Sequence, residues 1–247
     1  MSPHGLPDWG LTGPKHVTYG LDDVGEAVAR LGSPDVWDRR GDVMYQTDFR
    51  DGVAIGSLLA FGAGSAYALV NTRYMSGPYS VRFTTGAGAG AFTGLAMFQL
   101  PREASAFGWE LWFSTFPAPG LFDIRMQVRH AGRLYYGAIH YTPAAQLLEY
   151  QSAPLVYTVL DPAVGLLLNE DLFHVAKLVV DPLKPEYVRF LLDHHVYDLD
   201  GIPLVDGGAT PDESVQILFY MHTNAILPAK VWLDRMIFTV NEPVSQA

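Results

Sequence analysis

Polar side chains recur at every second position in the stretch from Phe122 to His130. The polar members of this alternation are Asp123, Arg125, Gln127 and Arg129. Because successive side chains of an extended strand point to opposite faces, the pattern predicts a β-strand with one polar and one apolar face. A face that carries Arg, Gln, carboxylate and Tyr groups can hydrogen-bond sugar hydroxyls while the Tyr ring stacks on a pyranose. The residues therefore permit carbohydrate binding.

Two short turns would fold the next two segments onto this strand. A two-residue turn at Ala131-Gly132 places Asp123 opposite His140, and a second tight turn at Pro143-Ala144 places His140 opposite Leu147. The predicted binding face, for a glycan or a protein partner, consists of Asp123, Arg125, Gln127, Arg129, Tyr136, His140, Glu149 and Gln151. An ordinary solvated sheet face with cross-strand ion pairs has the same pattern, so both interpretations stay open.

The segments that would position this face follow Gly41. Short runs of β-branched and aromatic residues alternate there with Gly, Pro, Asn and Asp, which is typical of a two-layered sandwich or a barrel. The expected strands are Val43–Phe49, Ala66–Asn71, Tyr79–Thr84, Phe92–Gln99, Trp109–Thr115, Phe122–His130, Arg133–Tyr141, Gln146–Gln151, Phe173–Asp181, Tyr187–Leu192, His195–Leu199, Val215–His222 and Lys230–Val240.

The chain before Gly41 has a different texture. Pro and Gly recur between Met1 and Tyr19, which predicts an extended or looped arm. One short helix is expected over residues 23–31, where Asp23 can cap its start and Gly32 its end. A helix of this length needs a surface to bury its apolar stripe. The residues expected to dock the arm on another subunit or particle are Leu6, Trp9, Leu11, Tyr19, Val24, Val28 and Leu31; folding back on the arm's own sandwich is the alternative.

Composition limits the possible partners. The net charge of -10 and the pI near 5.1 disfavour nucleic acid, because affinity for phosphates comes from clustered Lys and Arg. The chain has no cysteine, which excludes disulfides and thiolate metal sites. No stretch reaches the roughly 18 apolar residues of a membrane span, and Met1–Gly13 lacks the features of a secretory signal. We expect an arm over 1–41 and one sandwich domain over 42–243, made in a host cytoplasm without a membrane partner.

Four stretches of the body resemble the concanavalin A-like lectins and glucanases. These stretches are Thr47–Gly52, Ser76–Arg82, Trp109–Phe113 and Val231–Phe238. The resemblance implies an all-β fold, a two-sheet antiparallel jelly-roll sandwich that follows an N-terminal extended arm and one short helix. A narrower likeness to a group of uncharacterised tailed-virus-associated proteins covers Arg30–Ser33, Asp38–Asp42, Phe173–Asp181 and Glu186–Phe190. It implies a virion component, such as a capsid decoration or a tail-associated protein.

Catalytic and metal sites are not expected. Laminarinase-like members of the superfamily use a Glu-x-Asp-x-x-Glu strand, and the nearest stretch here, Trp109–Ser114, carries Glu110 alone. His194 and His195 are adjacent, so in an extended chain they point to opposite faces, and the surrounding residues are typical of a hairpin tip. We therefore expect no catalytic residue, no metal and no cofactor.

These observations together predict a non-enzymatic structural protein of a larger particle. It would act as a homo-oligomer in a virion, with other subunits of the same protein and a particle shell or tail protein as partners. A carbohydrate-binding module that recognises a surface glycan through the Asp123-to-Gln151 face is the alternative. A glycoside hydrolase is the third hypothesis.

Overall fold

The computed structural model describes residues 40–52, 57–75, 78–88, 90–101, 103–115, 120–223 and 228–244. Contacts divide the chain into residues 1–39 and residues 40–247. The expected arm, its helix over 23–31 and its docking residues from Leu6 to Leu31 lie outside the described residues. The strands below all belong to the second unit.

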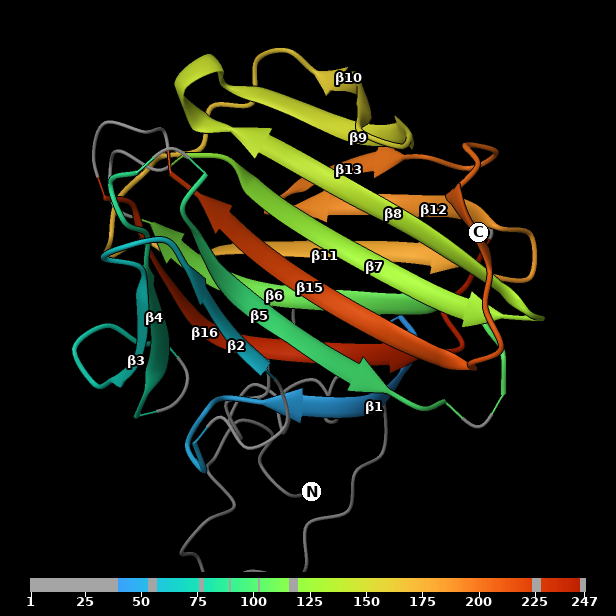
Figure 1. The fold of residues 1–247 in the computed structure, drawn as a ribbon, viewed down its shortest axis with the longest axis horizontal. Helices are drawn as coiled ribbons and strands as arrows, with labels where there is room; N and C mark the ends of the chain where they lie inside the picture. The colour runs from blue at the N-terminus through green and yellow to red at the C-terminus, as the bar shows by residue number, and fades with distance from the viewer. Residues whose placement is uncertain are drawn as a thin grey trace, which may run out of the picture. The chain divides into compact units, whose positions relative to one another are not determined.

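Two antiparallel sheets make up this unit, as the all-β prediction requires (Figure 1). Sheet A contains β1 (Asp42–Thr47), β3 (Ala66–Val70), β4 (Ser80–Thr84), β6 (Phe107–Thr115), β11 (His174–Asp181), β12 (Glu186–Leu192), β13 (His195–Asp198) and β16 (Lys230–Val240). Sheet B contains β2 (Ser57–Phe61), β5 (Phe92–Gln99), β7 (Phe122–His130), β8 (Arg133–Thr142), β9 (Leu147–Ala153), β10 (Val156–Asp161), β14 (Val205–Ala209) and β15 (Ser214–His222).

The strand order places β7 at the centre of sheet B, with β8 and β9 beside it toward the β10 edge. Sheet A runs β13-β12-β11-β6-β16-β4-β3, with β1 paired to β16. Sheet B runs β10-β9-β8-β7-β15-β5-β2, with β14 paired to β8. Figure 1 shows sheet B in front of sheet A, so one face of sheet B packs on the core and the other faces outward.

The core lies between the two sheets. On β7 the side chains of Phe122, Ile124, Met126 and Val128 are buried, and they belong to the same hydrophobic cluster as residues of sheet A. Burying one such side chain contributes about 1.5–3 kcal/mol, which fixes the apolar face of β7 inward. Because side chains alternate along a strand, the same burial turns the four polar residues of β7 outward.

Three strands are absent from the sequence-based prediction: β2, β10 and β14. β2 and β10 are edge strands, and β14 contains Gly207 and Gly208, so none shows a regular polar and apolar alternation. The predicted tight turn after β8 is also wrong. Pro143–Ala145 forms a 3-10 turn, and Gln146 adds a left-handed residue with φ 52°.

Lengthening this turn shifts β9 along β8. His140 therefore pairs with Glu149 rather than with Leu147. The shift is an even number of residues, so Glu149 and Gln151 stay on the predicted outward face. The register between β7 and β8 is the predicted one, with Asp123 opposite His140.

Candidate functional site

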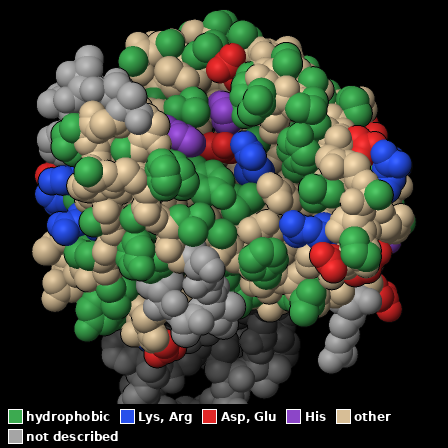
Figure 2. Space-filling view, in the orientation of Figure 1, with side chains coloured by type: hydrophobic (Ala, Val, Ile, Leu, Met, Phe, Trp, Pro, Cys, Tyr) green, Lys and Arg blue, Asp and Glu red, His purple; other side chains and the backbone are tan. Residues whose placement is uncertain are grey.

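A compact group of polar residues lies on the outward face of sheet B. β7 supplies Asp123 and Arg125, β8 supplies His140, β9 supplies Gln151 and β10 supplies Tyr157. We call these five residues the sheet B cluster. Figure 2 shows histidine, acidic and basic side chains gathered over this face and surrounded by hydrophobic groups.

Asp123 lies at the base of the sheet B cluster. Its Oδ2 atom accepts a hydrogen bond of 2.8 Å from Nη2 of Arg125 and lies 3.1 Å from Nε2 of His140. This second distance permits an ion pair, but the two groups are not aligned for a hydrogen bond. The carboxylate thus holds both a guanidinium and an imidazole near one point.

Tyr157 covers the imidazole from the side of β10. The His140 and Tyr157 rings are stacked with centroids 3.6 Å apart and planes inclined by 23°. Burial raises the pKa of Tyr157, and the nearby Asp123 charge raises it further. The charge of Arg125 acts on the Tyr157 hydroxyl and lowers its pKa in part. The hydroxyl is therefore protonated at neutral pH and can donate a proton.

Four buried polar atoms of the sheet B cluster have no hydrogen-bond partner among the described residues. They are Asp123 Oδ1, Arg125 Nε, His140 Nε2 and Gln151 Oε1. Asp123, His140 and Gln151 are only 3%, 7% and 2% exposed. Leaving a buried polar group unbonded costs about 1–3 kcal/mol, so this cluster has hydrogen-bonding capacity that a ligand or water can fill.

β15 adds two further titratable groups beside Asp123. Tyr220 lies directly opposite Asp123, and His222 follows on the same face. Burial raises the pKa of Tyr220. Burial lowers the pKa of His222, although the Asp123 charge opposes the shift. At neutral pH Tyr220 is therefore a hydrogen-bond donor and His222 an uncharged imidazole.

An aromatic strip continues from Tyr220 toward the β2 edge. The Phe61 and Phe92 rings are stacked with centroids 5.3 Å apart. Phe92 meets the Tyr220 ring edge-on at 5.7 Å. Phe61 is 63% exposed, so one face of the strip is open to solvent. Flat, exposed rings beside a polar cluster are suited to sugar rings, which have both apolar faces and polar edges.

The structure divides the predicted binding face. Glu149 lies across from His140, beside the sheet B cluster. Gln127 and Tyr136 pair with each other further along β7 and β8 and are half-buried. Arg129 lies about 20 Å from Asp123 along β7, at the rise of an extended strand. The eight predicted residues thus share one face but do not form one site.

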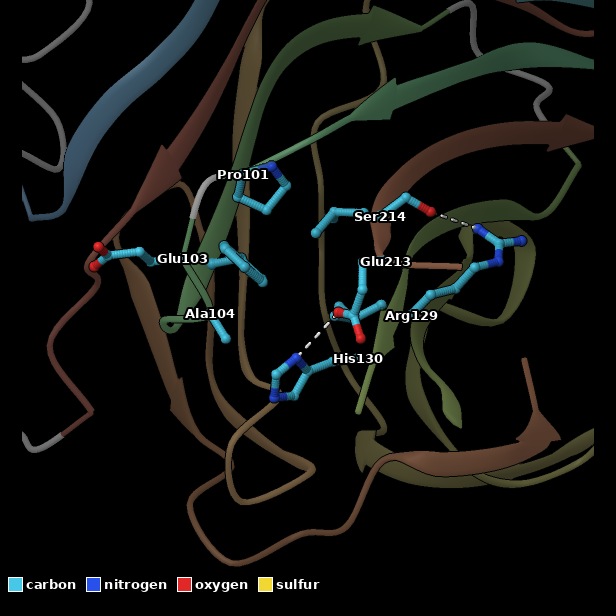
Figure 3. Close-up of a pocket in the computed structure, with 10 residues that line it drawn as sticks. Pro101, Glu103, Ala104, Arg129, His130, Glu213 and Ser214 are labelled. Carbon is cyan, nitrogen blue, oxygen red and sulfur yellow. Dashed lines mark hydrogen bonds and ion pairs between the residues drawn. The ribbon is translucent and has the colours of Figure 1, made fainter. Parts of the chain in front are cut away.

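Arg129 belongs instead to a pocket at the far end of β7. Figure 3 shows this pocket, which is lined by Glu103, Arg129, His130, Glu213 and Ser214 together with apolar residues. Nδ1 of His130 lies 3.2 Å from Glu213, and Arg129 donates to Ser214 Oγ at 3.3 Å. Because these polar groups pair with one another, the pocket directs few free groups at a ligand.

The other residues considered from the sequence lie elsewhere. Glu110 is buried and accepts a hydrogen bond of 2.7 Å from Nε1 of Trp112. His194 and His195 are exposed at the turn between β12 and β13, with ring centroids 4.0 Å apart. The described residues hold no group of three or more His, Asp or Glu placed to bind a metal ion. No helix in the described part of the chain is long and apolar enough to cross a membrane.

No protein-family model matches this sequence, and no curated protein matches it. Solved structures do match. The cellulose induced protein Cip1 superposes with a TM-score of 0.55 at 16% identity, covering 79% of this chain and 96% of Cip1. The fold is a concanavalin A-like sandwich. An endo-β-1,4-glucuronan lyase from Trichoderma reesei gives a TM-score of 0.55 at 9% identity, covering 83% and 100% of the two chains.

A carbohydrate esterase from the Shiga toxin-encoding bacteriophage phi24B has the same fold. Its TM-score is 0.53 at 11% identity, and the match covers 82% of this chain and 100% of the esterase. Identities this low show the fold alone. The prediction of a non-enzymatic protein is nevertheless contradicted, because a polysaccharide lyase and a carbohydrate esterase share this sandwich. The prediction relied on finding Glu110 without a second acid on its strand. That finding argues only against the laminarinase-like mechanism and not against other chemistries.

Proposed function

We propose that the protein binds an acidic polysaccharide on the outward face of sheet B and cleaves it at a uronate residue by β-elimination. The observation that carries the proposal is the sheet B cluster itself, with a guanidinium, an imidazole and a protonated phenol around incompletely bonded buried atoms. The shared fold with a glucuronan lyase adds support.

Arg125 is the group that would bind the uronate carboxylate. Its guanidinium is planar and presents paired donors that suit a carboxylate. Arg125 is partly exposed, with 22% of its side chain accessible, although Asp123 already occupies one of its nitrogens. Neutralising the substrate carboxylate makes the hydrogen on C5 more acidic, because the developing negative charge spreads onto that carboxylate.

His140 and Tyr157 would transfer the two protons. His140 takes the proton from C5, and the electron pair of that C–H bond forms the C4–C5 double bond. The C4–O4 bond then breaks, and Tyr157 gives its proton to O4, which leaves as a hydroxyl. The Asp123 carboxylate, 3.1 Å from Nε2 of His140, would offset the positive charge that the imidazole gains in this step. The products are a 4,5-unsaturated uronate and a shortened chain, and no other reactant is required.

The aromatic strip would hold a neighbouring sugar. Phe61 and Phe92 lie on the same face as the sheet B cluster, toward β2. A polysaccharide laid across the strands would therefore contact both. This placement supports binding along a chain rather than only at its end.

A comparison of polymers tests the proposed function. Glucuronan, alginate and neutral cellulose are incubated separately with the protein, and both ultraviolet absorbance and new reducing ends are measured. Absorbance that rises with an acidic polymer and not with cellulose is the expected result. Reducing ends without absorbance would indicate hydrolysis, and neither signal with any of the three polymers would indicate no cleavage; either result contradicts the lyase.

Placement on a virus particle remains part of the proposal. A bacteriophage carbohydrate esterase with the same sandwich is consistent with it. Removing residues 1–41 is expected to leave cleavage intact while preventing attachment to the particle. Normal incorporation of the truncated protein would contradict the docking role of the arm.

A further inference from the structure

Next to the sheet B cluster, β8 stops pairing with β9 and begins to pair with β14. From Ile139 to Thr142 it pairs with β9, and from Arg133 to Tyr136 it pairs with β14. Continuing the first register would pair Ala138 with Gln151, but that pair is missing from the ladder. Gly137 and Ala138 thus occupy a gap between the two pairings.

The Tyr187 hydroxyl fills this gap. Tyr187 belongs to β12 in sheet A, is fully buried, and its side chain crosses the core to sheet B. The amide of Ala138 donates to its oxygen at 2.9 Å, and the hydroxyl donates to the carbonyl oxygen of Gln151 at 2.9 Å. One phenol therefore replaces a backbone contact between β8 and β9.

Gly137 makes room for this phenol. A Cβ atom at Gly137 would lie 2.6 Å from Cε1 and 2.9 Å from Cζ of Tyr187. Real Cβ atoms do not approach other atoms so closely, so any larger residue would displace the ring. The backbone of β8 and the Tyr187 ring fit together only because this position is glycine.

Ala138 and Gln151, which the Tyr187 hydroxyl joins, lie next to residues of the sheet B cluster. Ala138 pairs with Arg125 and is followed two residues later by His140. Gln151 pairs with Tyr157 on β10. The separation of β8 from β9 at this point therefore sets how far His140 lies from Tyr157 and Gln151. Burial raises the pKa of Tyr187, so its hydroxyl keeps the proton that it donates.

We propose that the Tyr187 hydroxyl is a positioning group, which spaces β8 from β9 and thereby aligns His140 with Tyr157. The expected loss of catalysis rests on the proposed function, whereas the expected change in the spacing of β8 and β9 does not. A displacement of about 1 Å at a reacting group lowers a rate roughly 100-fold, so a small change in strand spacing is measurable.

Tyr187→Phe removes only the hydroxyl and leaves the ring to fill the core. Tyr141→Phe is the matched control, since the buried Tyr141 hydroxyl also donates to a backbone carbonyl, that of Val164, at 2.9 Å. The first readout needs no substrate. Stacking on Tyr157 shifts the NMR signals of the His140 ring, and these signals are expected to move in Tyr187→Phe and to stay in Tyr141→Phe.

The second readout uses glucuronan. In Tyr187→Phe, kcat is expected to fall about 10- to 100-fold with a smaller change in KM, because alignment rather than binding is lost. Tyr141→Phe is expected to lower the melting temperature comparably and to keep kcat. Unchanged His140 signals in Tyr187→Phe would overturn the positioning role. Wild-type protein that cleaves no acidic polymer would instead overturn the proposed function, while the NMR comparison still decides the role of Tyr187.

Discussion

Two of the regions with buried charges, the sheet B cluster and the surroundings of Glu242, differ in how completely those charges are bonded. In the sheet B cluster, four buried polar atoms have no partner among the described residues. Around Glu242 one buried atom, Nε of Arg189, lacks a hydrogen-bond partner among the described residues, but both oxygens of the carboxylate are occupied. Lys177 lies 2.7 Å from Oε1, Thr239 donates to the same oxygen at 2.5 Å, and Arg189 pairs with Oε2.

This difference separates a structural group from a candidate binding group. Lys177 and Arg189 also hold the backbone, donating to the carbonyl oxygens of Arg40 and Pro243 at 3.0 Å and 2.6 Å. They therefore tie the first and last described segments to sheet A. Among the described residues the sheet B cluster makes no such ties, and its incomplete bonding leaves capacity for a ligand.

The largest expected effect is on the Glu242 group. Glu242→Gln removes the charge that Glu242 places against the buried Lys177 and Arg189, and breaking a buried ion pair destabilises a protein by about 3–5 kcal/mol. Chemical denaturation measures the loss. Glu213→Gln is the control, because the Glu213 carboxylate is 61% exposed and its change is expected to stay within about 1 kcal/mol. Equal losses in the two variants would contradict the structural role.

The sheet B cluster should show the opposite behaviour. His140→Gln keeps the size and polarity of the side chain but removes the base, so kcat on glucuronan is expected to fall about 10²- to 10⁴-fold. The free energy of unfolding should change little. His195→Gln at the exposed hairpin turn serves as the control, with wild-type rates expected. A fully active His140→Gln protein would exclude His140 as the base.

A third ion pair gives a prediction about pH. Burial opposes the charge on His174, but the hydrogen bond and charge of Asp193 at 2.7 Å outweigh it, so the pKa of His174 is raised above 6.5. Burial likewise opposes the charge on Asp193, yet the hydrogen bonds from His174 and from the Val175 amide lower its pKa below 3.8. His174 therefore stabilises the fold at acidic pH and loses this effect as pH rises through its raised pKa. Asp193 loses its effect as pH falls through its lowered pKa.

Asp193→Asn tests this pH dependence. The variant is expected to have a lower free energy of unfolding than the wild type, and the loss is expected to be largest, about 2 kcal/mol, between pH 3.8 and 6.5. The loss is expected to shrink above the pKa of His174. Melting temperatures measured across this range check it, with Asp200→Asn on an exposed turn as the control. A deficit that grows steadily with pH would contradict the assignment.

The smallest expected effect belongs to the aromatic strip. Phe61→Ala removes an exposed ring that stacks on Phe92, so affinity for an acidic oligosaccharide is expected to fall by about 1 kcal/mol, roughly fivefold. Calorimetric titration measures it. Tyr67→Ala removes a similarly exposed ring from β3 of sheet A and should leave affinity unchanged. Equal affinities in both variants would remove Phe61 from the binding surface.

Part of the candidate site could be predicted from the sequence because it is local. The alternation on β7 fixes which side chains face outward, and the two-residue turn at Ala131-Gly132 fixes the pairing of Asp123 with His140. The longer turn after β8 shifted the β9 register without moving Glu149 to the other face. Fold class followed from the strand and turn pattern in the same way.

The rest of the site depends on contacts between distant segments. Tyr220 and His222 lie on a predicted strand, but nothing local indicates that β15 pairs with β7. Tyr157 was missed because β10 is an edge strand whose Val156 and Val159 are both exposed, so it lacks a clear apolar face. Tyr187 could not be anticipated, since its hydroxyl acts across the whole core.

A crystal structure of the His140→Gln variant with a bound glucuronan oligosaccharide tests the central claim most directly. We expect the sugar chain to lie across the outward face of sheet B, with a uronate carboxylate on Arg125 and the O4 atom of that sugar within reach of the Tyr157 hydroxyl. An oligosaccharide bound elsewhere on the molecule, or with its carboxylates turned away from Arg125, would contradict the claim.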